Sequence, residues 1–295
     1  MRWPLLPMQV SLKASNIFNY KGLVMLKLLK KQLTLIFYAL SYFTRVPIPA
    51  SIEFDNQQFH KANAYLPFIG LFVAIVMSVI FYLCLQLFSV PVSIILMLVT
   101  SLLLTGALHE DGFADCCDGL GGGYDATQRL KIMKDSQIGT YGGIGLILLF
   151  LLKFNLLIEL ADISFETLII SLLVAHTLSR YGALCIMQAM PYVRLAEAGK
   201  VQSLTNKLNS KYFVFASLVT AVLTVLLLFS LSKINTFIDI AVVAPIVTLI
   251  VAVIVASLYK LFDKNLAGYT GDCLGFTQQS LELSILLALT VLLAR

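Results

Sequence analysis

Charged residues are scarce in this chain of 295 residues, making up 13% of it against about 25% in soluble domains. Hydrophobic residues make up 59%, and the mean hydropathy is +0.90. A chain of this composition has too little polar surface to cover a core in water. The composition excludes a disordered chain, a basic nucleic-acid-binding domain and an ordinary cytosolic enzyme. It indicates a protein whose solvent is the lipid bilayer and whose partners do not include nucleic acid.

Metal-binding cysteine patterns are missing as well. The five Cys residues show no CxxC pair and no zinc-type spacing, so we interpret them as small apolar filler. Residues 1–24 lack the continuous apolar run and the cleavage site of a secretory signal. We therefore expect an N-terminal extension at 1–24, followed by a single membrane-embedded catalytic domain at 25–295.

Seven hydrophobic segments each approach the ~20 residues that a helix needs to cross a bilayer. Before them, residues 25–49 combine a basic start with an apolar continuation, which suits a helix at the inner leaflet. The sequence predicts an all-α, polytopic membrane helix bundle of about seven transmembrane helices, plus an N-terminal interfacial or re-entrant helix. The predicted spans are 64–88, 91–108, 142–160, 168–189, 212–231, 238–258 and 280–294.

The basic residues are distributed unevenly between the two faces of this arrangement. Of the 21 Lys and Arg residues, 17 lie in the N-terminal region and in the three long loops, which alternate to one face. The positive-inside rule places that face, with the N-terminus, in the cytoplasm. Because the loops on the other side are short, any chemistry is expected on the cytoplasmic face.

An acidic motif follows the second predicted span. Asp111, Asp115 and Asp118 are spaced i, i+4 and i+7, so they share one face of a helix. We expect them at the C-terminal end of the helix that carries the second span, where the macrodipole disfavours anions. Such a cluster requires protons or a cation, and oxygen ligands favour Mg²⁺, with Mn²⁺ as a substitute. The alternative is a solvated acidic loop beside a membrane helix.

Glycines and cations follow the acidic motif. Gly121 and Gly122 belong to a run that allows backbone N–H groups to approach a phosphate closely, although a flexible turn is the alternative. Arg129 and Lys134 supply positive charge, either to a substrate or as anchors at the membrane surface. Asp135 and Ser136, directly after them, add oxygen ligands.

Two further polar groups interrupt apolar sequence. Arg180 lies within the fourth span, where a guanidinium is costly unless it is paired. It serves either as a structural partner that offsets the Asp cluster or as a contact to a diphosphate. Asp272 lies with several glycines in the predicted loop 259–279, and is either a helix start or a contact to a polar ligand.

These motifs resemble those of a known family. TGALHEDGFADCCDGLGGG at 105–123, RLKIMKDSQIGTYGG at 129–143 and GYTGDCLGFTQQ at 268–279 are similar to segments of the cobalamin synthase family, the adenosylcobinamide-GDP ribazoletransferases. YFTRVPIP at 42–49 adds a weaker mark, and the resemblance runs from about Met25 to the C-terminus. Cys116-Cys117 replaces the small polar pair expected there, and Gln137 stands where a basic residue is common.

The resemblance implies an Mg²⁺-dependent transferase of cobalamin (vitamin B12) biosynthesis in the bacterial inner membrane. It implies that adenosylcobinamide-GDP is joined to α-ribazole, or its 5′-phosphate, with release of GMP. We expect Asp111, Asp115 and Asp118 to hold the metal on the diphosphate, and Asp135 to accept the proton of the attacking hydroxyl. The predicted substrate-binding residues are Gly121, Gly122, Arg129, Lys134, Ser136, Arg180 and Asp272.

Two other functions remain open on the residues alone. The segment from Asp115 to Gly119 matches the opening of the CDP-alcohol phosphotransferase signature, but the Ala-Arg and the later acidic spacing of that signature do not follow. A cation transporter would also use carboxylates. Transporters, however, usually place them near the midplane within paired repeats, and no repeat is evident here.

Overall fold

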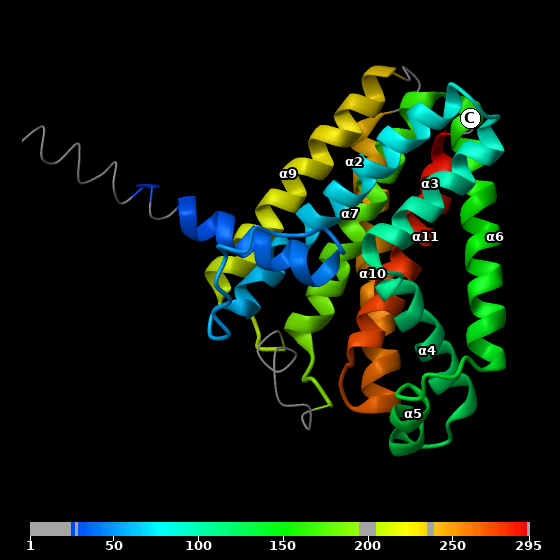
Figure 1. The fold of residues 1–295 in the computed structure, drawn as a ribbon. Coiled ribbons are helices and arrows are strands. Elements are labelled where there is room, and N and C mark those ends of the chain that lie inside the picture. The colour runs from blue at the N-terminus through cyan, green and yellow to red at the C-terminus, as the bar shows by residue number, and fades with distance from the viewer. Residues whose placement is uncertain (1–24, 27–28, 195–204, 235–238, 294–295) are drawn as a thin grey trace, which may run out of the picture.

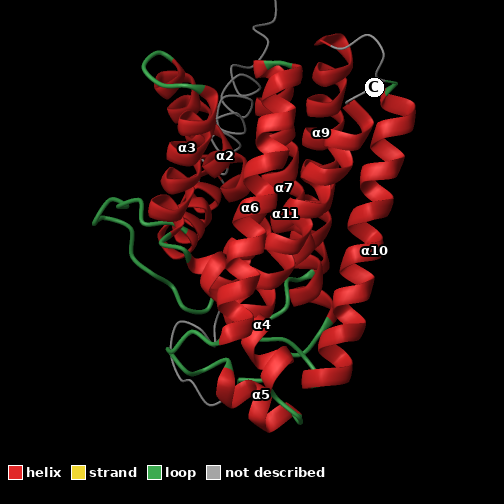
Figure 2. Cartoon of the chain, turned by 90° about the vertical axis from the view of Figure 1, so that its right-hand side faces the viewer, coloured by secondary structure: helices red, strands yellow, loops and turns green. Residues whose placement is uncertain are grey.

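The structure, a computed structural model, describes residues 25–26, 29–194, 205–234 and 239–293. These residues form helices joined by turns, which confirms the all-α prediction (Figures 1 and 2). The predicted extension at 1–24 lies outside the described residues. The helices are a short 3-10 helix η1 (Phe59–Tyr65), α2 (Leu66–Leu85), α3 (Val90–Thr105), α4 (Leu108–Gly122), α5 (Ala126–Ile132), α6 (Thr140–Ile163), α7 (Phe165–Ala189), α9 (Ser210–Ile234), α10 (Ile240–Leu266) and α11 (Gly271–Leu293).

Within the described residues, six helices are long and apolar enough to cross a membrane, or seven if α3 and α4 form one bent span. Each of the seven predicted spans corresponds to one of these helices. The predicted loop 259–279 was wrong, because α10 continues to Leu266 and α11 already begins at Gly271. Ala267 ends α10 in the left-handed conformation, and the Thr270 hydroxyl accepts the N–H of Cys273 to begin α11. Asp272 therefore lies on a helix.

The predicted N-terminal helix is present at residues 29–43. Figure 1 shows it lying across the long helices of the bundle rather than along them. Large apolar side chains, including Leu29 and Leu33, are exposed on it. This arrangement is consistent with a helix at a membrane surface, and its position relative to the bilayer stays a prediction.

A sharp break separates α3 from α4. Gly106 and Ala107 both adopt left-handed backbone conformations, with φ of 67° and 56°, and the two helices meet at 88°. The backbone N–H of Arg45 donates to the carbonyl of Leu104 at the end of α3, so the segment after the N-terminal helix packs against the break. Asp111 accordingly lies in the first turn of a new helix. The expectation that it sits at an unfavourable helix C-terminus was wrong, because α4 presents its positive end there.

Helices α7 and α11 form the centre of the bundle (Figure 2). More than half of each span is buried, in contrast to α10, where only 11% of the span is buried. In Figure 1 the lower ends of α4 and α10 lie beside α5, whereas the connection between α6 and α7 and the C-terminus lie at the opposite end. The end that carries α5 therefore also carries the glycine run at the end of α4.

The break predicts a specific sensitivity at Gly106. In Gly106→Ala a side chain would be forced into the left-handed region, which costs about 1–2 kcal/mol, and would collide with the Arg45 guanidinium. We expect a lower thermal unfolding midpoint in detergent. Gly143→Ala is the matched control, because a Cβ there meets nothing within 4 Å. Equal midpoints for the two variants would contradict the role assigned to the break.

Candidate active site

Two glycines bring the backbones of α4 and α11 into direct contact. A Cβ on Gly112 would lie 2.9 Å from the Cα of Asp272, and a Cβ on Gly275 would lie 2.7 Å from the carbonyl oxygen of His109. Beside this crossing, the rings of Phe113 and Phe276 stack at 5.0 Å. The contact places the acidic residues of α4 next to the first turn of α11.

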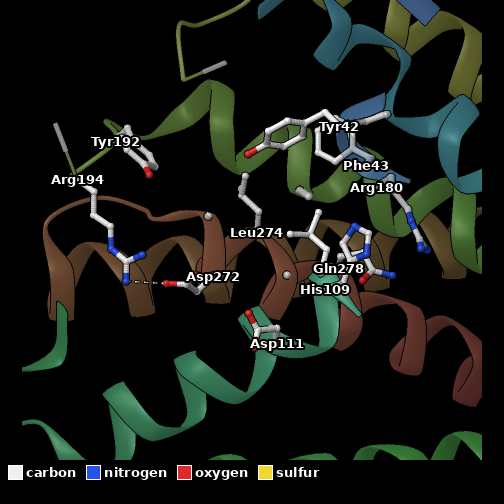
Figure 3. Close-up of a pocket in the computed structure, with 15 residues that line it drawn as sticks. Tyr42, Phe43, His109, Asp111, Arg180, Tyr192, Arg194, Asp272, Leu274 and Gln278 are labelled. Carbon is white, nitrogen blue, oxygen red and sulfur yellow. Dashed lines mark ion pairs between the residues drawn. The ribbon is translucent and has the colours of Figure 1, made fainter. Parts of the chain in front are cut away.

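A cavity of about 230 Å³ opens at this crossing (Figure 3). Its walls come from the N-terminal helix, the start of α2, α4, α7, the segment after α7 and the first turns of α11. Burial raises the pKa of Tyr42, so its hydroxyl stays neutral at the wall. The polar and aromatic lining residues include Tyr42, His109, Asp111, Arg180, Tyr192, Arg194, Asp272 and Gln278.

Three carboxylates gather around the α4–α11 crossing. Asp111 and Asp272 line the cavity, and the charge of Asp115 interacts with those of both. Arg194 is the cation that pairs with this group in the described part of the chain, through a 2.8 Å contact between its Nη2 and Oδ2 of Asp272. The site therefore combines oxygen donors that suit a hard divalent cation with guanidinium groups that suit phosphate.

Asp118 does not line the cavity, although its charge also interacts with that of Asp115. It is buried, its Oδ2 accepts the backbone N–H of Gly139 at 2.7 Å, and its Oδ1 accepts that of Gly142 at 2.8 Å. These bonds satisfy donors at the start of α6. The described residues contain no group of three or more His, Cys, Asp or Glu arranged to hold a metal ion. Asp118 is thus engaged by the α6 backbone, and its predicted role as a metal ligand stays a prediction.

A buried ionic cluster lies behind the cavity. Glu282 of α11 contacts the Lys153 Nζ from α6 and the Arg180 Nη1 from α7, each at 2.7 Å. All three residues are at most 4% exposed. Arg180 also lines the cavity, and its Nε has no hydrogen-bond partner among the described residues. The prediction that Arg180 requires a counter-charge is correct, but the partner is Glu282 rather than the acidic motif.

The cluster extends to α4 through Gln279. Its amide accepts from Lys153 and donates to Oε1 of Glu110, both at 2.7 Å, while the buried Oε2 of Glu110 has no hydrogen-bond partner within the described part of the chain. Sequence reasoning assigned no role to Lys153, Glu110 or Glu282. The sequence did contain an indication of this cluster, because Lys153 and Glu282 each lie within an apolar span and charged groups in a membrane require partners.

The other predicted residues lie outside the cavity lining. Arg129 donates to the carbonyl of Asn265 at the end of α10, which favours a cation. Asp135 accepts the N–H of Gln137 in a local turn and is exposed, as are Lys134 and Ser136. Gly121 and Gly122 form the last residues of α4, with Gly121 against the Tyr141 ring. Their predicted roles in substrate binding stay predictions.

The fold and the cavity define a multi-pass helical membrane protein with carboxylates and arginines around one recess. The chain belongs to the cobalamin-5-phosphate synthase family, whose model matches residues 35–290. This match confirms the resemblance, and it favours this family over the CDP-alcohol phosphotransferases and over a transporter.

Bacterial relatives cover nearly the whole chain. An adenosylcobinamide-GDP ribazoletransferase of Vibrio cholerae serotype O1 is 40% identical over 270 residues, 91% of this chain and 98% of the relative. Proteins of the same name from Shewanella woodyi and Shewanella pealeana are 40% and 37% identical, over 88% and 89% of this chain and 97% of each relative. No solved structure matches the chain.

Removing the central anion of the ionic cluster should destabilise the bundle. In Glu282→Gln, Lys153 and Arg180 lose their shared counter-charge, and breaking such a buried pair costs about 3–5 kcal/mol. We expect a marked fall in the unfolding midpoint in detergent. The double variant Glu282→Gln/Lys153→Met removes one charge of each sign and should recover part of the loss. A double variant less stable than Glu282→Gln would contradict the ion-pair assignment.

Proposed function

We propose that this chain joins adenosylcobinamide-GDP to α-ribazole, or to its 5′-phosphate, and releases GMP. Family membership supports the reaction class, a transferase of cobalamin biosynthesis acting on a nucleoside diphosphate ester. The observation that carries the site assignment is the cavity at the α4–α11 crossing, which two aspartates and two arginines line. Phosphoryl transfer depends mainly on positioning and charge stabilisation, and this lining supplies groups for both.

In the proposed reaction a ribose hydroxyl of α-ribazole attacks the phosphorus that carries the aminopropanol side of cobinamide. A new O–P bond forms, the P–O bond within the diphosphate breaks, and GMP leaves with the bridging oxygen. The hydroxyl proton is lost to a base. Arg180 lines the cavity and its buried Nε has no hydrogen-bond partner among the described residues, so its guanidinium is placed to bind a phosphate oxygen and stabilise the leaving group. Asp135 lies outside the cavity lining, so the proposal does not keep it as the base.

The acidic group fits an Mg²⁺ ion shared with the substrate. Mg²⁺ is usually bound through one or two carboxylates together with substrate phosphates, so a preformed cage of three is not needed. We propose that Asp111 and Asp115 hold the ion, with Asp272 as the neighbouring third carboxylate in place of Asp118. When bound, the ion would neutralise charge on the diphosphate. Mn²⁺ is the expected substitute.

We further propose that the cavity end of the bundle faces the cytoplasm of a bacterial cell, with the N-terminus on the same side. The excess of Lys and Arg in the corresponding loops supports this orientation. It gives a nucleotide-linked substrate direct access to the site, and it leaves the apolar faces of α6, α9 and α10 to lipid.

The central test is a reaction of the purified, detergent-solubilised protein with adenosylcobinamide-GDP, α-ribazole and Mg²⁺. We expect GMP and a cobalamin product in equal amounts, with turnover lost on EDTA treatment and restored by Mg²⁺ or Mn²⁺. Omission of α-ribazole is the control and should stop GMP release. A protein that produces no GMP, or that conducts ions across proteoliposomes without nucleotide, would refute the proposal.

Asp115 and Asp118 should respond differently to the same substitution. Asp115→Asn removes a proposed cation ligand and should abolish turnover while leaving the unfolding midpoint close to wild type. Asp118→Asn replaces one acceptor of the α6 N–H bonds by a donor, and should lower the midpoint because a buried N–H loses its partner. Asp239→Asn, at the N-terminus of α10, is the control for both. Normal turnover of Asp115→Asn would remove it from the site.

A further inference from the structure

A short backbone pairing holds Arg194 at the cavity. The N–H of Val193 donates to the carbonyl of Tyr269, and the N–H of Tyr269 donates to the carbonyl of Pro191, each at 3.0 Å. These two bonds form the parallel bridge between Tyr192 and Tyr269. The segment after α7 is thereby fixed beside the turn that begins α11, and Arg194 reaches the first turn of that helix (Figure 3).

Arg194 and Arg180 both line the cavity, from separate segments of the chain (Figure 3). Arg180 is 3% exposed, and its position is fixed by Glu282 behind it. The Arg194 side chain is 19% exposed and forms an ion pair with Asp272, which also lies on the cavity wall. Arg180 is therefore a fixed cation, while Arg194 contacts a carboxylate that the cavity itself exposes.

The wall between the two arginines also favours an anion. It includes Gly271, Asp272, Leu274 and Gly275 at the N-terminus of α11, where the macrodipole is positive. Arg180 belongs to the same lining, and its buried Nε has no hydrogen-bond partner among the described residues. A dianionic group in this recess would interact favourably with both the N-terminus of α11 and the Arg180 guanidinium.

We propose that Arg194 is a phosphate-binding residue, which exchanges its Asp272 partner for an oxygen of the substrate's diphosphate. This inference deepens the proposed function by assigning Arg194 to the nucleotide substrate rather than to α-ribazole. Guanidinium binds carboxylate and phosphate with the same planar geometry, so the exchange requires only a short movement of the side chain. Without substrate, Asp272 keeps Arg194 in place; with substrate, Asp272 is released next to Asp115.

The experiment measures binding of GDP, a probe that carries the diphosphate without the corrinoid. Titration calorimetry compares the wild type with Arg194→Gln, Asp272→Asn and the double variant. We expect Arg194→Gln to weaken GDP binding roughly 10- to 100-fold, the range for loss of a charge-assisted hydrogen bond. The double variant should bind GDP as weakly as Arg194→Gln. Recovery of wild-type affinity in the double variant would overturn the proposal, because Arg194 would then only neutralise Asp272.

Steady-state kinetics supply the second readout. Arg194→Gln should raise KM for adenosylcobinamide-GDP and leave KM for α-ribazole within about twofold, whereas a structural defect would change both. Arg194→Lys keeps the charge but loses the planar fork, and should lie between wild type and Arg194→Gln in GDP affinity. Arg194→Lys also provides the comparison with wild type if Arg194→Gln does not fold. Lys260→Gln, an exposed charge near the end of α10, is the control.

The outcomes separate this inference from the function on which it rests. GDP binding that is unchanged in Arg194→Gln overturns the role of Arg194, even if the wild type turns over normally. A wild type without ribazoletransferase activity refutes the proposed function, while the GDP titrations still report on Arg194. Equal increases in KM for both substrates also count against the proposal.

Discussion

The close contact of α4 and α11 at Gly112 and Gly275 is the constraint on which the site depends. A side chain at either glycine would overlap backbone atoms of the other helix, so the two helices lie this close only because both positions lack a Cβ. The acidic residues of α4 and Asp272 of α11 become neighbours as a consequence. The 88° break between α3 and α4 supplies the direction of approach. The chemistry at the cavity is thus set by two backbone features that carry no charge.

The ionic cluster behind the cavity pairs charged side chains that are buried inside the bundle. Charged groups inside a membrane protein are costly unless they are paired, and here Glu282 pairs with cations from two other helices. Breaking such a group is expensive, although an apolar replacement of the whole group is often neutral. The presence of the cluster is therefore better explained by the position in which it fixes Arg180 than by a gain in the stability of the bundle. It holds Arg180 with one edge of the guanidinium against Glu282 and with Nε unpaired.

The sequence predicted the helical bundle, the seven spans and the common face of Asp111, Asp115 and Asp118, because hydropathy and helical spacing are local properties. It did not predict the break at Gly106 and Ala107, since an alanine in the left-handed region leaves no mark in composition. It misplaced the start of α11 because the polar residues Asp272, Gln278 and Gln279 suggested a loop. In the structure these side chains face other polar groups within the bundle. The roles of Glu282 and Arg194 depend on contacts between helices distant in the chain. The spacing of residues within one helix does not indicate such contacts.

The size of the cavity limits what it encloses under the proposed function. At about 230 Å³ it lies below the range of roughly 300–1,000 Å³ that is typical of pockets enclosing a drug-sized ligand. A substrate with a corrin ring at one end and a guanosine at the other is far larger. The recess therefore has room for the diphosphate at which bonds change, and the bulky ends remain outside it. An adjoining space of about 70 Å³, lined by Tyr42, Tyr192 and Tyr269, offers aromatic surface next to the charged groups. A site at the end of a helical bundle suits this division, because both large substrates reach it from the same side and only their reacting groups need to leave water.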